Sequence, residues 1–320
     1  MMENSIPTKT PDPLVIGVDG GGTKTVAWLA PMVDDGSGKM LGRGTAGPGN
    51  PRAVGFETAQ ANIDAAIAAA FADAGLAPTT VAAACFGLAG AGRAAEQQQI
   101  MAWALERGIA AKVKVTDDAE PMLAAASPDG CGIALIAGTG SLCLGRNSAG
   151  DTARCGGWGY LLGDEGSGYA IALAGLRAAM RAADGRGPPT DLLAAFQHKL
   201  GAASPQELVG KVYAPEMTRE RLAALASVVF DLATTDEVAM RIVRGAVDDL
   251  ASLVAAVAER LQLPAHRYTL ALAGGALLNQ LNYLDRVVYA ALGRLHDAPP
   301  ERWIVVTEPV RGAVTLARIL

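Results

Sequence analysis

Short apolar runs separated by glycine-rich turns dominate the first part of the chain. Between Leu14 and about Thr45 three such runs follow one another, and the first turn between them holds three consecutive glycines. This pattern predicts an antiparallel meander of three strands, rather than the strand-to-helix start of a dinucleotide-binding fold. Beyond about Phe56, apolar residues recur at helical spacing as far as Gly75, so we expect a helix there.

The same pattern returns later in the chain. Buried strands are predicted at Val81–Leu88 and Lys112–Thr116, with a helix between them. A second meander begins at Gly132, and a helix follows it from about Ser167 to Ala183. Two copies of strand–strand–strand–helix indicate an internal duplication, and a chain of 320 residues is long enough for two domains of ordinary size.

The remaining segments complete these two domains. Helices joined by loops are expected at about 185–240, and they form an insertion. A strand ends in Gly274 and Gly275, and a last strand precedes a closing helix at Gly312–Leu320, which is expected to pack back on the first domain. We therefore expect an N-terminal domain of residues 14–122 and 307–320, and a C-terminal domain of residues 123–306.

Composition excludes several classes of function. The formal net charge is −5 and no cluster of basic residues occurs, which argues against a nucleic-acid-binding protein. The apolar runs are too short for a membrane span, and the N-terminal MMENSIPTKTPDP lacks the apolar segment of a signal peptide, so a loose tail is expected. The four cysteines form no CxxC pair or Cys/His group. We expect free thiols in a cytoplasmic protein.

The first glycine turn carries candidate chemistry. Glycines permit a positive φ and leave no side chain in the way, so backbone N–H groups and hydroxyls can close around an anion. An ordinary hairpin also favours glycine, but three in a row between an Asp and a Thr exceed what a hairpin needs. Asp19 cannot lie against a phosphate without a cation, so we expect it to face Mg²⁺, directly or through water. The predicted phosphate-binding residues of this turn are Gly20, Gly21, Gly22, Thr23 and Lys24.

A second turn occupies the same place in the repeat. It consists of Gly138, Thr139, Gly140 and Ser141. A GTGS string alone is weak support, but together with the first turn it suggests two halves that each grip part of one phosphate chain. The sequence therefore predicts a nucleotide-dependent phosphotransferase.

Two adjacent aspartates are candidates for the catalytic base. Transfer of a phosphoryl group to a hydroxyl needs a group that orients the attacking oxygen and accepts its proton. No histidine lies near a motif, and Asp117 and Asp118 lie where a predicted strand gives way to a helix. Open α/β sheets bind their ligands at such places. The alternative is that Asp118 simply caps the helix.

The densest motif runs from Cys155 to Ser167. Its Gly-Gly-Trp-Gly string exposes the indole of Trp158, and an aromatic face commonly packs on the C–H face of a sugar ring. A carboxylate nearby, such as Asp164, can accept hydrogen bonds from sugar hydroxyls. Acids before a helix are also favoured by the helix dipole, which explains one of Asp164 and Glu165 but not the Trp-Gly cluster.

Two further elements are weaker when taken alone. Asn50, in GPGNP, is a loop amide that can bind a polyhydroxy substrate. Gly274 and Gly275 would let a purine and its ribose lie against the backbone, although a tight strand-to-helix turn explains them equally well.

Taken together, GVDGGGTKT, TDDA, AGTGS, CGGWGYLLGDEGSGY and LAGGALL resemble, in order and separation, the N-acetylglucosamine kinase branch of the BadF/BadG/BcrA/BcrD-type ATPase family. That family lies within the acetate and sugar kinase, heat-shock chaperone and actin superfamily. The resemblance begins at Leu14 and is weakest between Gly185 and Ala265. It implies an α/β fold of two ribonuclease-H-like domains with a duplicated ββαβ-type core, mixed sheets and a ligand cleft between the domains.

The resemblance also implies an activity and a set of residues. The activity is ATP- and Mg²⁺-dependent phosphorylation of the 6-hydroxyl of an amino sugar, and a homodimer is the expected assembly. The catalytic aspartate of the family falls on Asp118, the phosphate contacts on both glycine turns with Thr23, and the adenosine motif on Gly274 and Gly275. Its sugar contacts fall on Asn50, Thr139, Gly140, Trp158, Gly159 and Asp164.

Three alternatives stay open. AGAGRA at Ala89–Ala94 departs from the family pattern, so the choice between N-acetylglucosamine, glucosamine and related sugars is not fixed, although the CGGWG string favours the N-acetylated sugar. An activator ATPase of the same family would need two cysteines per chain to share an iron–sulfur cluster at a dimer interface. A regulator without catalysis is disfavoured because Asp19, Asp118 and both turns are intact.

Overall fold

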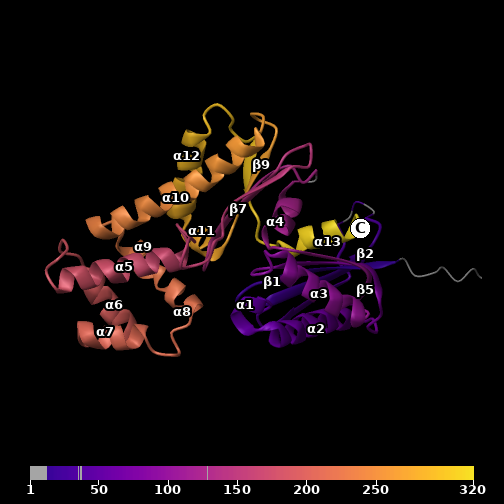
Figure 1. Cartoon of the computed structure of the whole chain (residues 1–320), viewed down its shortest axis with the longest axis horizontal. Coiled ribbons are helices and arrows are strands. Elements are labelled where there is room, and N and C mark those ends of the chain that lie inside the picture. The colour runs from indigo at the N-terminus through magenta and orange to yellow at the C-terminus, as the bar shows by residue number, and fades with distance from the viewer. Residues whose placement is uncertain (1–12, 35, 37, 128) are drawn as a thin grey trace, which may run out of the picture. The chain divides into compact units, whose positions relative to one another are not determined.

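The computed structural model describes residues 13–34, 36, 38–127 and 129–320, so the N-terminal tail expected from the sequence lies outside the described residues. The chain divides into two compact units (Figure 1). The first unit comprises the chain up to Ala125 together with Glu308–Leu320, and the second unit is Ala126–Thr307. Each unit is built around one five-stranded mixed sheet.

The sheet of the first unit has the strand order β3-β2-β1-β4-β5. The first three strands form the predicted antiparallel meander, while β4 and β5 continue the sheet parallel to β1. Their bounds are Leu14–Gly20 for β1, Thr25–Pro31 for β2, Gly42–Ala46 for β3, Val81–Leu88 for β4 and Ala110–Thr116 for β5.

Helices cover both faces of this first sheet (Figure 1). Successive residues of a strand point to opposite faces, and here both faces carry apolar side chains, so each face forms a core with the helices that cover it. Ile16 and Val18 of β1 pack on the face covered by α2 and α3, whereas Val15 packs on the face covered by α13. A side chain at Gly17 would place its Cβ 2.4 Å from Val314 N, so glycine lets α13 lie close against β1. The helix bounds are Pro51–Val54 for α1, Phe56–Asp73 for α2, Ala94–Glu106 for α3, Ala119–Ala126 for α4 and Val310–Arg318 for α13.

The sheet of the second unit, ordered β10-β9-β6-β7-β8, repeats the topology of the first. Again three strands form an antiparallel meander and two more run parallel to its first strand. The internal duplication predicted from the sequence is therefore confirmed at the level of topology. The strand bounds are Gly132–Ala137 for β6, Ser141–Arg146 for β7, Thr152–Gly156 for β8, Thr269–Ala273 for β9 and Arg302–Val305 for β10.

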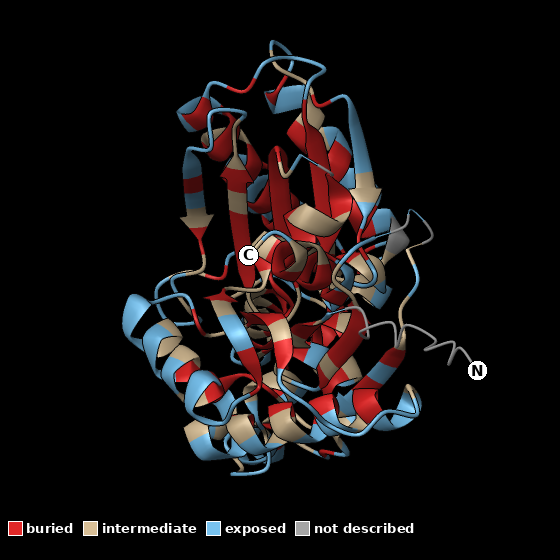
Figure 2. Ribbon diagram, turned by 90° about the vertical axis from the view of Figure 1, so that its right-hand side faces the viewer, coloured by how far each residue is buried: buried red, intermediate tan, exposed pale blue. Residues whose placement is uncertain are grey.

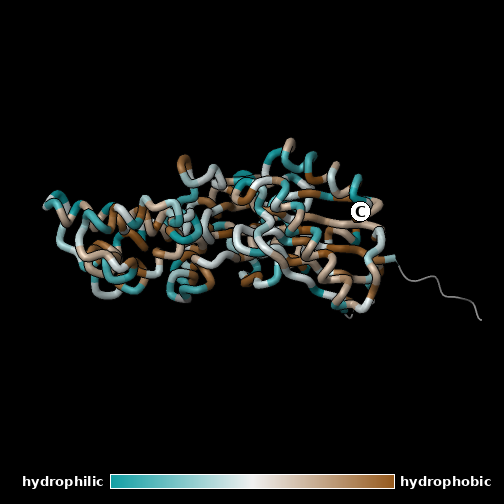
Figure 3. The backbone as a smooth tube through the Cα atoms, turned by 90° about the horizontal axis from the view of Figure 1, so that it is seen from below, coloured by the Kyte–Doolittle hydropathy of each residue, from teal (hydrophilic) through white to brown (hydrophobic). Residues whose placement is uncertain are grey.

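The helices of the second unit include the predicted insertion, which consists of α6 to α9. The long helix α10 buries an apolar face that includes Val243, Leu250 and Val254. Burial is concentrated in the strands and in the helix faces that cover them (Figure 2), and hydrophobic and hydrophilic residues alternate along the helical segments (Figure 3). No helix among the described residues is long and apolar enough to cross a membrane. The bounds are Gly168–Ala183 for α5, Leu192–Leu200 for α6, Pro205–Val212 for α7, Arg219–Ala224 for α8, Ala226–Leu232 for α9, Glu237–Leu261 for α10, Gly275–Leu278 for α11 and Leu281–Arg294 for α12.

Candidate active site

The first glycine turn joins β1 to β2 and is surrounded by two other backbone segments. Gly21 N donates to Lys24 O at 2.9 Å within the turn. Asn50 N donates to Gly21 O at 3.2 Å, and Ala89 N donates to Gly20 O at 2.9 Å. The turn, the loop that carries Asn50 and the segment after β4 therefore form one connected site in the first unit.

Asp19 lies on β1, one residue before this turn, and its side chain is largely removed from water. Burial raises the pKa of the Asp19 carboxyl to about 6, although the Lys24 ammonium opposes the rise. Among the described residues no group of three or more His, Cys, Asp or Glu side chains could hold a metal ion. A single carboxylate fits Mg²⁺, which is usually held by one or two carboxylates together with water and substrate phosphates.

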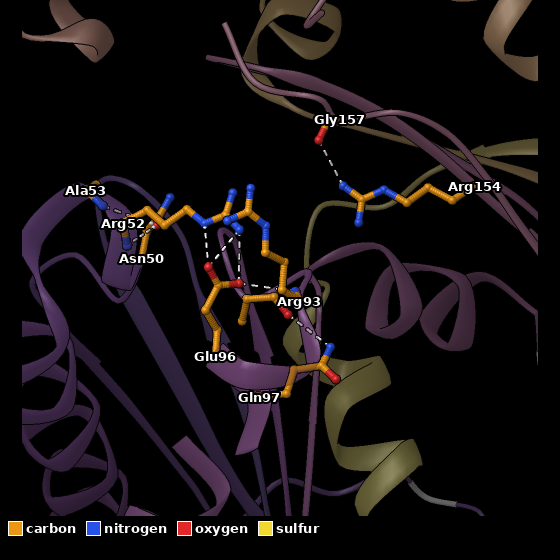
Figure 4. Close-up of polar contacts among 9 residues, drawn as sticks. Asn50, Arg52, Ala53, Arg93, Glu96, Gln97, Arg154 and Gly157 are labelled. Atoms are coloured by element: carbon orange, nitrogen blue, oxygen red, sulfur yellow. Dashed lines mark hydrogen bonds and ion pairs between the residues drawn. The ribbon is translucent and has the colours of Figure 1, made fainter. Parts of the chain in front are cut away.

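The two ends of the Asn50 side-chain amide have different roles: the oxygen caps a helix, and the NH₂ group is left for a ligand. Its Oδ1 caps α1 by accepting from Arg52 N at 3.0 Å and from Ala53 N at 3.3 Å (Figure 4). No described residue accepts from its Nδ2, and no fully buried side-chain nitrogen or oxygen in the described part of the chain is without a partner. The Asn50 Nδ2 therefore remains accessible, and it can donate to a sugar hydroxyl.

Two adjacent aspartates, Asp117 and Asp118, follow β5. Asp117 Oδ1 caps α4 by accepting from Ala119 N at 3.1 Å and from Glu120 N at 3.3 Å. Asp117 therefore supplies two of the hydrogen bonds that the first turn of α4 needs. Because β1, β4 and β5 are parallel, the half-buried Asp118 lies at the same edge of the sheet as the first glycine turn.

The second glycine turn joins β6 to β7, and a separate segment before α5 packs against it. Ser141 N donates to the Asp164 carboxylate at 3.3 Å, and Ser141 Oγ donates to Glu165 O at 2.7 Å. A side chain at Gly140 would place its Cβ 2.9 Å from Asp164 Oδ2. Gly168 N, at the start of α5, donates to Gly138 O at 2.8 Å. The backbone N–H and the hydroxyl of Ser141 thus both form hydrogen bonds within the second unit. Thr139 and Gly140 are the other residues of this turn.

Asp164 is held under strain inside the second unit. It is only 5% exposed, and its φ of 61° lies in the left-handed region that non-glycine residues seldom adopt. Burial raises the pKa of the Asp164 carboxyl above its ordinary value, although the Ser141 N–H and the charge of Arg219 oppose the rise. Strained residues of this kind often belong to functional sites.

Trp158 stands outside the core, on a loop whose path only glycine allows. Gly156, Gly157 and Gly159 have φ values of 73°, 68° and 89°, and Arg154 Nη2 donates to Gly157 O at 3.1 Å (Figure 4). Trp158 itself is 76% exposed. An indole this exposed contributes little to the core, so its face is available to a ligand.

Gly274 and Gly275 lie beside the second glycine turn. An ideal Cβ on Gly138 would lie 3.7 Å from Gly275 N and 3.8 Å from Gly274 Cα. At Gly274, whose φ is 103°, a Cβ would lie 2.3 Å from Ala137 O. The second unit therefore gathers the second glycine turn, Asp164 and the Gly-Gly pair at one end of its sheet.

Sequence reasoning missed the contacts that hold these loops. Thr25 Oγ1 donates to Gly47 O at 2.8 Å, and Tyr283 Oη donates to Gly166 O at 2.8 Å. The partners are 22 and 117 positions apart. The one usable signal was a hydroxyl residue at the start of the second strand of each hairpin, Thr25 of β2 and Ser141 of β7.

Comparison with known proteins shows which family shares this arrangement. The chain is 35% identical over 271 residues to an N-acetylmuramic acid/N-acetylglucosamine kinase from Clostridium acetobutylicum. This alignment covers 84% of this chain and 87% of that protein. It is 32% identical over 261 residues to an N-acetyl-D-glucosamine kinase from Dictyostelium discoideum, covering 78% and 81% of the two chains.

Solved structures agree on the fold. A putative N-acetylglucosamine kinase from Chromobacterium violaceum superposes with a TM-score of 0.76 at 24% identity, over 96% of this chain and 99% of the other. A ROK hexokinase from Thermus thermophilus gives 0.55 at 19% identity, over 95% and 98%. The predicted fold class, two ribonuclease-H-like domains with a duplicated core and mixed sheets, is confirmed. The family model for BadF/BadG/BcrA/BcrD ATPases matches residues 16–317, and the chain belongs to this family.

Proposed function

We propose that the protein is a kinase that transfers a phosphoryl group from ATP to the 6-hydroxyl of an amino sugar, with N-acetylglucosamine as the expected neutral substrate. The observation that carries this proposal is the pairing of equivalent glycine turns in two equivalent sheets, each beside a polar residue suited to sugar hydroxyls. The names of the Clostridium and Dictyostelium relatives support the substrate class. A cytoplasmic homodimer remains the expected form of the enzyme.

Each unit carries residues that suit a sugar. In the first unit the Asn50 Nδ2 can donate to a sugar hydroxyl, and in the second unit the Asp164 carboxylate can accept from one. The exposed indole of Trp158 packs on the apolar face of the pyranose. This combination suits a polyhydroxy ring with one apolar face.

Each glycine turn suits the phosphates of ATP, and Gly274 and Gly275 suit its purine and ribose. When bound, ATP supplies the phosphoryl group and Mg²⁺ balances its charge. Asp19 is the residue that would hold the ion. Its pKa of about 6 means that the carboxylate is charged at neutral pH, so it can bind a cation there.

Asp118 acts on the acceptor. Its carboxylate accepts a hydrogen bond from the sugar hydroxyl, orients that oxygen, and takes its proton as the new P–O bond forms. The bond to the departing nucleotide breaks with its electron pair remaining on the nucleotide oxygen. Asp117 is the less suitable residue, because its Oδ1 already accepts from two N–H groups of α4.

The activator-ATPase alternative is disfavoured by the cysteines. Cys85, Cys131 and Cys143 are buried, and Cys155 lies opposite Cys143 across the β7–β8 pair. A cluster shared between two subunits requires thiolates at the surface where the subunits meet. The burial of these three thiols therefore favours the kinase.

A substrate panel tests the proposal. Purified protein is incubated with ATP, Mg²⁺ and one of N-acetylglucosamine, glucosamine, N-acetylmuramic acid or glucose, and ³¹P–¹H correlation locates the phosphate on the product. Asp118→Asn protein, purified in the same way, controls for contaminating kinases. The proposal expects a 6-phosphate on an amino sugar. Brown, iron-containing protein that phosphorylates none of the sugars would support the activator instead.

A further inference from the structure

The segment that departs from the family pattern lies directly against Asn50. Gly90 has a φ of 83°, and a side chain there would place its Cβ 2.3 Å from Asn50 Oδ1, so only glycine fits. Ala91 N donates to Leu88 O at 3.0 Å, and Gln97 Nε2 donates to Ala91 O at 2.9 Å (Figure 4). These contacts hold the segment Ala89–Ala94 in place beside Asn50, the amide proposed to bind the sugar.

Arg93, near the end of this segment, lies beside Glu96 of α3 and Arg52 of α1 (Figure 4). The Glu96 carboxylate accepts from Arg52 Nε at 2.9 Å and from Arg52 Nη2 at 2.7 Å, and it also accepts from the Arg93 backbone N–H at 3.1 Å (Figure 4). Glu96 therefore fixes Arg52 by its side chain and Arg93 by its main chain. Two positive charges share one negative charge, so the cluster carries a net charge of about +1.

The Arg93 guanidinium has no structural task that the described residues reveal. It is exposed, and within the described part of the chain no carboxylate pairs with it. Figure 4 shows its side chain extending on the same side of Glu96 as the Arg52 guanidinium. Arg52 is explained as the partner of Glu96, whereas the five N–H donors of the Arg93 guanidinium have no acceptor among the residues that the structure describes.

We propose that Arg93 binds the carboxylate of an acidic amino sugar, so that the enzyme accepts a hexosamine with a carboxylic acid side chain as well as the neutral sugar. The inference rests on the proposed function, because it places the sugar at Asn50. A guanidinium matches a carboxylate with two parallel hydrogen bonds, and this geometry is lost with an uncharged amide. In N-acetylmuramic acid the carboxylic acid is joined to the sugar ring through an ether. From a ring bound at Asn50, this side chain can extend to Arg93 on the neighbouring segment.

The test compares two substrates and two variants. For Arg93→Gln, kcat/KM with N-acetylmuramic acid is expected to fall about 10- to 100-fold, the range for losing a charged hydrogen-bonding partner, while kcat/KM with N-acetylglucosamine changes less than about threefold. Arg107→Gln is the matched control, since Arg107 is an exposed arginine of the same unit that pairs with Asp64 at 3.1 Å. It should leave both substrates unchanged. The carboxamide of N-acetylmuramic acid should be insensitive to Arg93→Gln.

Each contrary result has a distinct meaning. A wild-type enzyme that phosphorylates N-acetylglucosamine but not the acid would overturn the role of Arg93 and leave the proposed function standing. Equal losses on both sugars in Arg93→Gln, or no loss on the acid, would also overturn it. A wild-type enzyme that phosphorylates no amino sugar would overturn the proposed function, and this inference with it.

Discussion

The two glycine turns occupy equivalent places in the two sheets, but they obtain their carboxylates from different parts of the chain. In the first sheet Gly20 pairs with Thr25 across the turn, and Asp19 lies one pair before it. In the second sheet Ala137 pairs with Ser141, and the position corresponding to Asp19 is the apolar Ile136. The carboxylate at the second turn comes instead from Asp164, on the segment before α5.

A second feature is shared by both turns. Thr25 and Ser141 occupy the same position after the turn, both are buried, and each donates its hydroxyl to a carbonyl of a neighbouring loop, Gly47 O in the first unit and Glu165 O in the second. Each of these loops carries a residue proposed to bind the sugar. We call these two hydrogen bonds the loop anchors. The two units therefore share the loop anchor, but the carboxylate beside the turn comes from a different part of the chain in each unit.

The difference suggests a division of roles. The first unit places two carboxylates, Asp19 and Asp118, at one edge of its sheet, where they can serve the metal and the acceptor hydroxyl. The second unit offers the exposed Trp158 and the buried Asp164, which suit binding. Substitutions in the first group should therefore lower kcat, and substitutions in the second should weaken sugar affinity.

The largest effect is expected for Asp118→Asn. Loss of the proposed general base should lower kcat by a factor of ~10²–10⁴, while sugar and ATP affinities change by less than about tenfold, because no binding surface is removed. Steady-state kinetics and calorimetric titration measure the two. The matched control is Asp117→Asn, which keeps an oxygen for the α4 cap and should retain activity. Near-normal turnover in Asp118→Asn, with loss in Asp117→Asn, would move the base one residue upstream.

Asp19→Asn should separate function from stability. Removing the carboxylate that is proposed to face Mg²⁺ should lower kcat by roughly 10²–10³, the range for losing one electrostatic group at a phosphoryl-transfer site. The same change should stabilise the ligand-free protein near pH 8 by about 1–3 kcal/mol, because a buried charge is removed. Denaturant unfolding without Mg²⁺ or nucleotide measures this gain.

The direction of the pH dependence follows from the pKa of Asp19. The pKa of this group is raised from 3.8 to about 6 in the folded protein. The folded state therefore binds more protons than the unfolded state between about pH 4 and pH 6, and the stability that protonation contributes is lost as pH rises through about 6. The variant and the wild type should converge near pH 4. A gain that persists unchanged at pH 4 would contradict this account.

The sequence predicted individual strands and helices better than it predicted the contacts between them. Strands such as Val81–Leu88 and helices such as α10 follow from local periodicity, which one segment carries by itself. Gly90 against Asn50, and Glu96 against Arg52, depend on residues about 40 positions apart being folded together, and no local pattern records such a pair. That Asp117 accepts from the first N–H groups of α4 also depends on the backbone conformation, which local sequence does not specify.

Trp158→Ala should weaken sugar binding without unfolding the protein. Covering one face of the indole removes ~50–100 Å² of apolar area from water, worth roughly 1–2.5 kcal/mol, or about 5- to 70-fold in sugar affinity. Because the side chain is 76% exposed, the loss of stability should stay within about 0.5 kcal/mol. Calorimetric titration with sugar and with ATP, together with thermal melting, measures both.

Trp28 provides the contrasting control for this prediction. It is 3% exposed and packs in the core beneath α13, with the Arg43 guanidinium 4.5 Å from its ring. Trp28→Ala should lose about 3–5 kcal/mol of stability and show no selective effect on the sugar. If Trp158→Ala behaved like Trp28→Ala, the indole would be a structural side chain.

The smallest effects are expected at the loop anchors, and they decide whether the two turns are equivalent. Thr25→Val and Ser141→Ala each remove one hydroxyl and leave a carbonyl oxygen without that partner, at an expected cost of about 1–3 kcal/mol in stability. Because each anchor holds a loop that carries one sugar-binding residue, both variants should weaken sugar affinity about two- to fivefold and leave kcat within about twofold. Thr25→Ser keeps the hydroxyl and should restore the affinity. Equal losses at the two positions would mean that the two anchors have equivalent roles in their own units, whereas a loss at Ser141 alone would mean that only the anchor of the second unit supports sugar binding.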